Sequence, residues 1–582
     1  MVDVAELCRN THTHRDWVRA AEEACVRLHA TVADLNGRSG LYRALCDAQE
    51  ACAQGRSPPL SVEGATVAAS LRGEFERGGV HLPASAREAL QAAQAQAVAA
   101  GHALSRQLSS PGGLRWILSD VPAPAEAQGA MLRARAARLS GRGAGRAQQE
   151  DSSPLLALLH ARARIAQLLG YRSYAALATA PLFARSPEAP SRFCAQLAQA
   201  LGGPAREEAA HAAALAGRSA PGGGGVDPGA SLRASLFSPG DMQAASRYFT
   251  VRSCVAGLCS VSERLFGVTL VEAPLAVGEA WAPGLVKLAA RHAEEGPLGV
   301  VYLDLHPRPG KHLPGAAHFV IRAGRSRGQG SGASVALVAS LGSGEGGALP
   351  HSGVVLLHHE WGHALHSLLS RTRYQHLSGT RGPVDCVEAP STLVERLAWT
   401  QGALDLWARS PQDTPLPPQL LHRLRAARTA CGASDALQQV VQATADLAMH
   451  GAPGPEHVDA AFVAACLDDA AAQHGQRGHG QRGHWLRSFG HVVGYGAVYY
   501  AYLYGTALSG SAWRVLGLDA QPLSRSAGQQ LWAHLLRPGG TALPAQALAT
   551  LLGPQALASL AGDGVPDAPS VALAVRDILD GP

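Results

Sequence analysis

The sequence predicts a mainly helical protein that contains one small β-sheet. Alanine and leucine are abundant and arginine is scattered among them, and these residues favour helices. Apolar residues recur at helical spacing over long stretches of the N-terminal part of the chain. Three short apolar runs between residues 298 and 340 have instead the length and the β-branched content of strands.

Helical periodicity is clearest in four stretches of the first third of the chain, which are 17–35, 84–105, 153–170 and 187–202. Between the second and the third of them, residues 120–152 are weakly patterned, and we expect a loop at Gly141–Gln149. The run APGGGGVDPG at 220–229 is expected to be a linker or a surface insertion.

The expected strands cover 298–305 (LGVVYLDL), 318–323 (HFVIRA) and 334–340 (SVALVAS), with a Pro/Gly/His-rich connection between the first two. Helices are expected again from residue 390 onward. Within them, residues 475–484 contain the tandem repeat GQRGH-GQRGH. A histidine-rich tract can bind metal, but a duplicated surface loop is the favoured interpretation because no acidic partner is nearby.

Composition and charge exclude several classes of protein. A net charge of +5 over 582 residues gives no basis for a nucleic-acid partner. Ten cysteines without a C-x-x-C pair favour a reduced, intracellular chain. No apolar stretch reaches the ~18 residues that span a bilayer. The N-terminus, MVDVAELCRNTHTHRDW, has the features of neither a secretory nor an organelle signal, so we expect a cytosolic protein or one whose presequence is missing.

The stretch HHEWGH at 358–363 places three histidines and a carboxylate in an apolar run, which is costly unless something pairs them. His359 and His363 are four residues apart, so a helix presents both on one face. This is the H-E-x-x-H arrangement, in which two histidines bind zinc and the glutamate, Glu360, is the general base. His358 has Gly362 four residues on and no helical partner. The alternative is a buried helix whose histidines form hydrogen bonds within the protein and bind no metal.

A catalytic zinc needs a third protein ligand and an open position. One known spacing fails here, because His366 and Leu369 stand where it requires a glycine and a histidine. The next candidate is VDCVEAPSTLVERLAW, 384–399, in which Asp385 and Glu388 precede a proline-containing helix start. Glu388 as the third ligand gives a His₂Glu site, a type used for peptide hydrolysis.

Helical spacing puts Glu388, Ser391 or Thr392, and Glu395 on one face. With Glu388 as a ligand, Asp385, Glu395 and His366 are left as possible hydrogen-bond partners of the ligand imidazoles. Glu395 can equally be a solvated helix carboxylate.

Together, HEWGHALH and SGTRGPVDCVEAPSTLVE resemble the thimet oligopeptidase family of zinc peptidases, whose third ligand follows the second histidine at the interval seen from His363 to Glu388. A second block, FGHVVGYGAVYYAYLYGTAL at 489–508, resembles the Gly/Tyr-rich loop of the family. Within the family, SRTRYQHLSGTRGP and GHVVGYGAVYYAYL are most similar to the mitochondrial intermediate peptidase branch. Gly382, Cys386 and the Gly/Ser insertion at 325–350 depart from that branch.

The resemblance implies a large, two-lobed helical peptidase with a deep central channel, zinc at its floor and a small β-sheet beside the zinc helix. It also implies an N-terminal helical region at 1–190 and a catalytic region at 191–582. One zinc ion per chain, or another divalent metal, would activate a water molecule for Glu360. The implied donors for the tetrahedral oxyanion are His491, Tyr495, Tyr499 and Tyr502, with Tyr495 and Tyr502 favoured. Taken alone, GYGAVYYAYLYG could also be an aromatic-packed helix.

The function that the resemblance implies is removal of a short N-terminal peptide from imported precursors in the mitochondrial matrix. The substrate is then a peptide or a precursor protein, and we expect a monomer without nucleic acid or membrane span. One alternative is a general oligopeptidase that degrades short peptides in an organelle, a plastid included, or in the cytosol. Another is a catalytically silent binding protein, against which the intact H-E-x-x-H and Glu388 argue.

Overall fold

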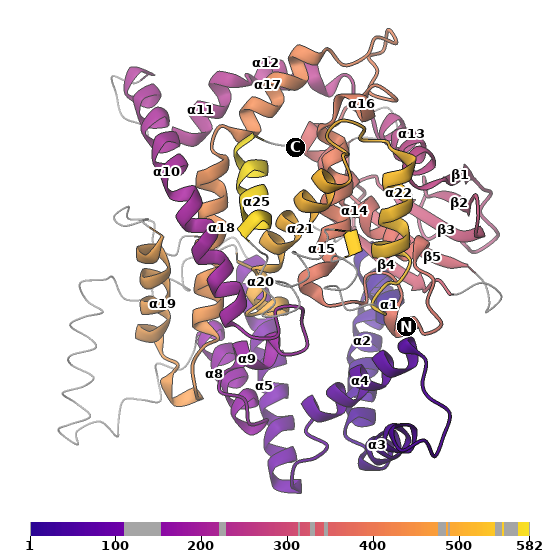
Figure 1. Ribbon diagram of the computed structural model, residues 1–582, viewed down its shortest axis with the longest axis vertical. Coiled ribbons are helices and arrows are strands. Elements are labelled where there is room, and N and C mark those ends of the chain that lie inside the picture. The colour runs from indigo at the N-terminus through magenta and orange to yellow at the C-terminus, as the bar shows by residue number, and fades with distance from the viewer. Residues whose placement is uncertain are drawn as a thin grey trace.

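The computed structural model describes residues 2–109, 153–219, 228–311, 315–325, 332–342, 347–474, 485–486, 489–541, 550–551 and 568–580. Within these residues the chain is mainly helical and has one five-stranded sheet (Figure 1). The predicted fold class is thereby confirmed. The loop expected at Gly141–Gln149 and the GQRGH repeat lie outside the described residues.

Eleven α-helices and one π-helix of the described chain precede the sheet: α1 (Val2–Thr11), α2 (Arg15–Asn36), α3 (Ser39–Ala53), α4 (Val62–Arg77), α5 (Ala84–Ser109), α8 (Pro154–Leu168), α9 (Tyr174–Thr179), α10 (Glu188–Ser219), α11 (Pro228–Leu236), α12 (Pro239–Ser246), α13 (Val251–Val261) and η2 (Ser262–Phe266). The four stretches expected to be helical correspond to α2, α5, α8 and the start of α10. Helix α10 continues through Pro204, beyond the expected end at 202. The residues after this proline still pack into the protein, since Ala205 and Ala212 are buried.

The helices that follow the sheet carry the predicted site residues except Tyr499, which lies in a turn between two of them. They are α14 (His351–Leu369), η3 (Gln375–Leu377), α15 (Val384–Glu395), η4 (Arg396–Trp399), α16 (Gln401–Leu404), α17 (Pro418–Thr429), α18 (Gly432–Met449), η5 (Pro455–His457), α19 (Ala460–Gln473), α20 (His491–Tyr495), α21 (Ala501–Val515), α22 (Arg525–Leu531), η7 (Trp532–Leu536) and α25 (Ala568–Asp580). Among the described residues, none of these or the earlier helices is long and apolar enough to cross a bilayer.

The sheet has the strand order β1-β2-β3-β5-β4, and only β3 and β5 are parallel neighbours. The strands are β1 (Val268–Glu272), β2 (Val286–His292), β3 (Gly296–Asp304), β4 (Ala316–Arg322) and β5 (Ala333–Ala339). All three expected strands are present, but β5 lies between β3 and β4. Its seven residues are all buried, which fits a central strand, whereas β4 is half-buried at the edge.

Strands β1 and β2 were not expected from the sequence. Strand β1 is mostly exposed and β2 carries Lys287 and Arg291 between its apolar residues, so neither is a plain apolar run. Pairing, not composition, makes them strands, because β2 pairs with β3 and β1 pairs with β2.

Two sides of the molecule meet at α14, α15 and α21, which lie between the sheet and the long helices α10 and α18 (Figure 1). One core joins the sheet to α13 and α14. A second joins α10, α18, α21 and α25, and a third joins α5, α8, α18 and α19. The second core contains Phe183 as well as Leu197, so side chains from both sides of residue 190 share it. The boundary at 190 stays a prediction.

Candidate metal centre

Helix α14 carries HHEWGH and is buried around most of its circumference. His358 is fully buried, its Nδ1 donates to the Val354 carbonyl at 2.8 Å, and its ring stacks on Trp407. Burial lowers the pKa of His358 to about 4, so the ring is neutral at pH 7. The helical register that set His358 apart from the other two histidines therefore holds in the structure.

Helix α15 begins at Val384, so Asp385 and Glu388 lie inside it and not before it as expected. Ser391, one turn on, donates from Oγ to Glu388 Oε2 at 3.0 Å and orients that carboxylate. The two helices approach closely at Gly362, where a Cβ would lie 2.5 Å from Ser391 Cα. The glycine of HHEWGH thus lets α15 bring Glu388 to the histidines of α14.

The structure brings His359, His363 and Glu388 together. Glu388 Oε2 lies 3.2 Å from His359 Nε2 and 3.4 Å from His363 Nε2. The three ligand atoms fall within 4.8 Å of one another, and this is the one such group of histidine, cysteine and carboxylate side chains in the described part of the chain. Two imidazole nitrogens and a carboxylate oxygen, with no fourth protein ligand, are the donor set of a catalytic zinc site. The residues therefore fit a divalent metal ion.

The charges of this group are set by its own members. Burial opposes ionisation of Glu388, but the imidazoles of His359 and His363 lower its pKa below the usual range, so it is an anion at neutral pH. Burial disfavours a charged His359, but Glu388 and Glu395 together raise the pKa of His359 to about 10. The site therefore favours positive charge, whether a proton or a metal ion that displaces it.

Glu395 is the partner of a ligand imidazole, since its Oε2 lies 3.4 Å from His359 Nδ1. Asp385 is not, because it accepts hydrogen bonds from the Phe183 and Ala184 amides and from the Tyr500 hydroxyl instead. His366 is buried, and neither of its ring nitrogens has a hydrogen-bond partner among the described residues. Of the three candidates for this position, only Glu395 contacts a ligand.

Glu360 lies beside the ligands and is 8% exposed. Burial raises the pKa of its carboxyl, while His363 and His359 act in the opposite direction. A backbone hydrogen bond from His318, on the edge strand β4, also lowers the pKa of Glu360. A carboxylate with a raised pKa is a stronger base than a free glutamate, which suits the predicted role.

The Gly/Tyr segment, residues 489–502, consists of α20, a turn and the start of α21. Helix α20 ends at Tyr495 and α21 begins at Ala501, so the alternative of one continuous aromatic helix is wrong. The His491 ring lies 5.3, 5.0 and 5.6 Å from the rings of Tyr495, Tyr499 and Tyr502. His491 Nε2 is buried and has no partner within the described chain.

The segment faces the metal-binding residues. Burial raises the pKa of Tyr502 to about 12, and the negative charge of Glu388 and, more weakly, of Glu360 contributes to the shift. Helix α21 packs against α15, where a Cβ on Gly505 would lie 2.8 Å from Glu388 Cβ. Tyr495 and Tyr502 are 53% and 40% exposed, so their hydroxyls can meet a bound molecule. Tyr499 instead packs against Phe489.

Several residues near the site gave no signal in the sequence. The His318 ring lies 5.8 Å from that of His363 and hydrogen-bonds to Ser367 Oγ at 2.9 Å. Arg162 on α8 and Asp446 on α18 bond to the Gly/Tyr segment, and His450, directly after α18, bonds to Arg162. No local spacing connects these residues to HHEWGH, so only the fold reveals them.

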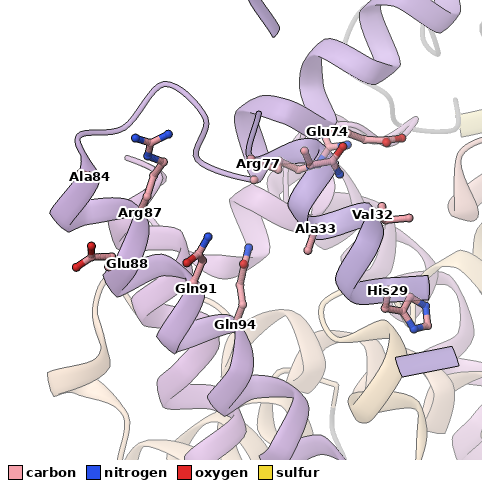
Figure 2. A pocket seen from close by; sticks show the side chains of 13 residues that line it. His29, Val32, Ala33, Glu74, Arg77, Ala84, Arg87, Glu88, Gln91 and Gln94 are labelled. Carbon is pink, nitrogen blue, oxygen red and sulfur yellow. The ribbon is translucent and has the colours of Figure 1, made fainter. Parts of the chain in front are cut away.

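A separate hollow of about 560 Å³ lies among α2, α4 and α5 (Figure 2). Gln91 and Gln94 extend from α5 toward α2, and charged side chains of both signs, such as Glu74 and Arg77, line it. It contains none of the predicted site residues, and its mixed charges favour no one class of ligand.

Comparison with known proteins gives three findings. The sequence model of Peptidase family M3 matches residues 125–559. The mitochondrial intermediate peptidase of Arabidopsis thaliana is 31% identical, and the match covers 97% of this chain and 86% of that protein. Mitochondrial intermediate peptidase 2 of Cryptococcus neoformans var. neoformans is 28% identical, and the match covers 95% of this chain and 78% of that protein. The solved structure of PZ peptidase A with an inhibitor is similar in fold, at a TM-score of 0.56 and 14% identity, with 100% and 89% covered.

Proposed function

Because the chain belongs to peptidase family M3 and is a metallopeptidase, we propose that it is a zinc endopeptidase of the intermediate-peptidase type. It removes a short N-terminal peptide from precursor proteins imported into mitochondria. The observation that carries this proposal is the grouping of His359, His363 and Glu388 beside Glu360, in a chain similar over 97% of its length to a protein of that name.

In the proposed mechanism, His359, His363 and Glu388 hold the metal, and Glu395 and Ser391 fix the orientation of two of these ligands. A zinc ion held by these residues would supply Lewis-acid chemistry, which would make water a better nucleophile and the scissile carbonyl more electrophilic. Glu360 accepts the proton of the attacking water and delivers it to the leaving amine. Its buried position favours uptake of the proton, because burial stabilises the protonated carboxyl.

The Gly/Tyr segment supplies donors for the oxyanion. Tyr495 and Tyr502 present exposed hydroxyl-bearing rings, and His491 has a buried nitrogen that no described residue hydrogen-bonds. Tyr502 keeps its proton throughout the physiological range because its pKa lies at about 12. Tyr499 is the weakest of the four candidates, since its ring packs against Phe489.

The peptide binds as an added strand along β4. This strand pairs only with β5 within the described sheet, and its His318 lies beside His363 and Glu360. Main-chain pairing at a sheet edge binds extended peptides with little regard to sequence, so an unfolded precursor N-terminus is a suitable substrate.

The test is incubation of the zinc-loaded protein with long precursor-derived peptides and with short peptides, with products read by mass spectrometry. One cut near the N-terminus of a long precursor that depends on the residues upstream of the cut supports the proposal. Cleavage of many short peptides and failure on long ones identifies a general oligopeptidase. Glu360→Gln should lose about 10²–10⁴-fold in turnover and still bind zinc; full hydrolysis by this variant refutes the assignment of Glu360.

The proposed location is the mitochondrial matrix, by similarity to proteins named for mitochondria. Immunolocalisation in the source cells tests it. The proposed monomeric state is tested by light scattering coupled to size-exclusion chromatography, where a mass near 60.2 kDa is expected.

A further inference from the structure

The Gly/Tyr segment is attached to a buried polar network that belongs to other helices. The network consists of Arg162 on α8, Asp446 on α18, and His450, which directly follows α18. Arg162 is 5% exposed, Asp446 is fully buried and His450 is 2% exposed. Three charged or polar side chains are thus removed from water beside a segment that faces the metal-binding residues.

The network binds the backbone of the segment at four points. Asp446 Oδ1 accepts the Ala497 amide at 3.0 Å, and Oδ2 accepts the Tyr499 amide at 3.1 Å. Arg162 donates to the Val492 carbonyl at 2.6 Å and to the Val493 carbonyl at 2.7 Å. Tyr495 lies between the two pairs of contacts, so its backbone is held from both sides.

His450 joins the two halves of the network. Its Nδ1 donates to the Asp446 carbonyl at 2.8 Å, which leaves Nε2 to accept from Arg162 Nη1 at 2.9 Å. The Arg162 guanidinium also lies over the Tyr174 ring, 5.1 Å from its centroid. Each member of the network therefore fixes the next one.

The backbone that the network holds includes an unfavourable conformation. Ala497 has a φ of 68°, in the left-handed region that residues with a side chain rarely adopt. Its amide is one of the two bonded to Asp446. Residues held in such conformations by their surroundings cluster at functional sites.

Stability alone does not explain this arrangement. Removing charged groups from water offsets most of the energy that their pairing supplies, and apolar residues of similar volume often stabilise a core as well. What the network provides beyond stability is a fixed path for residues 492–499 between His491 and Tyr502.

We propose that Arg162, Asp446 and His450 are positioning residues for peptide hydrolysis. They fix the backbone of the Gly/Tyr segment so that His491, Tyr495 and Tyr502 meet the oxyanion as it forms. The inference rests on the proposed function. Misplacing a catalytic group by about 1 Å can cost on the order of 10²-fold in rate, so loss of the network should lower kcat more than it raises KM.

The experiment compares Asp446→Asn with Asp304→Asn in the full-length, zinc-loaded protein. Asp304 is also a buried carboxylate, 4% exposed, and is paired with Arg308 and Lys311 away from the Gly/Tyr segment. Asp446→Asn should lower kcat by about 10–100-fold and change KM and zinc affinity by less than threefold (~0.7 kcal/mol). Asp304→Asn should leave kcat per zinc-loaded molecule unchanged. An equal fall in both variants overturns the proposal.

Combination with Tyr502→Phe separates positioning from general damage. If Asp446 acts through Tyr502, the double variant should lose far less than the product of the two single losses. Fully multiplicative losses overturn the proposal. Arg162→Lys keeps the buried charge and one of the two carbonyl contacts, so it should fold more readily than Asp446→Asn. Its kcat should fall less than that of Asp446→Asn, again with little change in KM.

Hydrogen exchange gives a readout that does not need peptidase activity. The amides of residues 492–499 should exchange faster in Asp446→Asn than in the wild type, and at the wild-type rate in Asp304→Asn. Unchanged exchange in Asp446→Asn overturns the positioning role. Absence of peptide hydrolysis by the wild-type protein instead overturns the proposed function.

Discussion

Glu395→Gln is the change that tests how the metal-binding residues are held. The carboxylate of Glu395 lies 3.4 Å from His359 Nδ1, on the side of the ring opposite Glu388. A glutamine has the same size and can still contact the imidazole, but it has no negative charge to support a ligand nitrogen. The expected result is weaker metal binding with the fold intact.

The structure sets the magnitude near the low end of the usual range. Loss of a carboxylate that supports a ligand histidine typically costs 10–100-fold in metal affinity. Here the contact is long for a hydrogen bond, and the Glu395 side chain is 22% exposed, so solvent screens part of its charge. We therefore expect a loss of about tenfold, or ~1.4 kcal/mol.

The assay is competition for zinc between the protein and a chromophoric chelator at fixed pH. Glu295→Gln is the matched control, because Glu295 is likewise a largely buried carboxylate, but it pairs with Arg371 and Arg537 instead of an imidazole. Zinc binding by Glu395→Gln as tight as that of the wild type would show that Glu395 does not support the ligand His359. An equal loss of affinity in both variants would show the same.

Three further predictions concern turnover, packing and pH. Tyr502→Phe should lower kcat by about 10²–10³-fold with little change in KM, as steady-state kinetics on a cleaved peptide will show. Gly505→Ala should lower the free energy of unfolding by about 1–3 kcal/mol and weaken zinc binding, because the new Cβ would lie 2.8 Å from Glu388 Cβ. Calorimetry with and without zinc checks both effects. Burial alone would raise the pKa of Asp304, but Arg308, Trp281 and Lys311 lower it below the usual value, so its contribution to stability is present above about pH 4 and lost as pH falls further. The fall in melting temperature from pH 5 to pH 3 should accordingly be shallower in Asp304→Asn.

The sequence predicted those parts of the site that depend on local spacing. The four-residue interval between His359 and His363 needs only a helix to become a pair of neighbouring ligands. Glu388 was found from the kind of residue that such a site requires and from the family interval. Asp385 was wrongly considered as a partner of the ligands, because its true partners, the Phe183 and Ala184 amides, lie some 200 positions earlier in the chain.

Features that depend on long-range pairing could not be predicted in this way. The insertion of β5 between β3 and β4 is decided by which strand is buried on both faces, and the sequence order of the strands does not contain that information. Likewise, Arg162, Asp446 and His450 are single polar residues in otherwise ordinary helical stretches. Their meaning arises only when α8, α18 and the Gly/Tyr segment come together.

Three glutamates stand around the two histidines, and their surroundings alone give them different chemistry. Glu388 accepts from both imidazoles, so its pKa falls and it remains an anion fit to bind a metal. Glu360 is about as buried but lacks such a contact, so burial raises its pKa and it can take up and release a proton. Glu395 contacts the far nitrogen of His359 through one carboxylate oxygen, and its other oxygen lies 3.8 Å from Arg428 Nη2. Environments that push the pKa values of neighbouring carboxyls apart are how one site assigns acid–base and binding roles. Exchanging Glu360 for Asp, which withdraws the carboxylate by one methylene while leaving its charge, should therefore impair proton transfer and not metal binding.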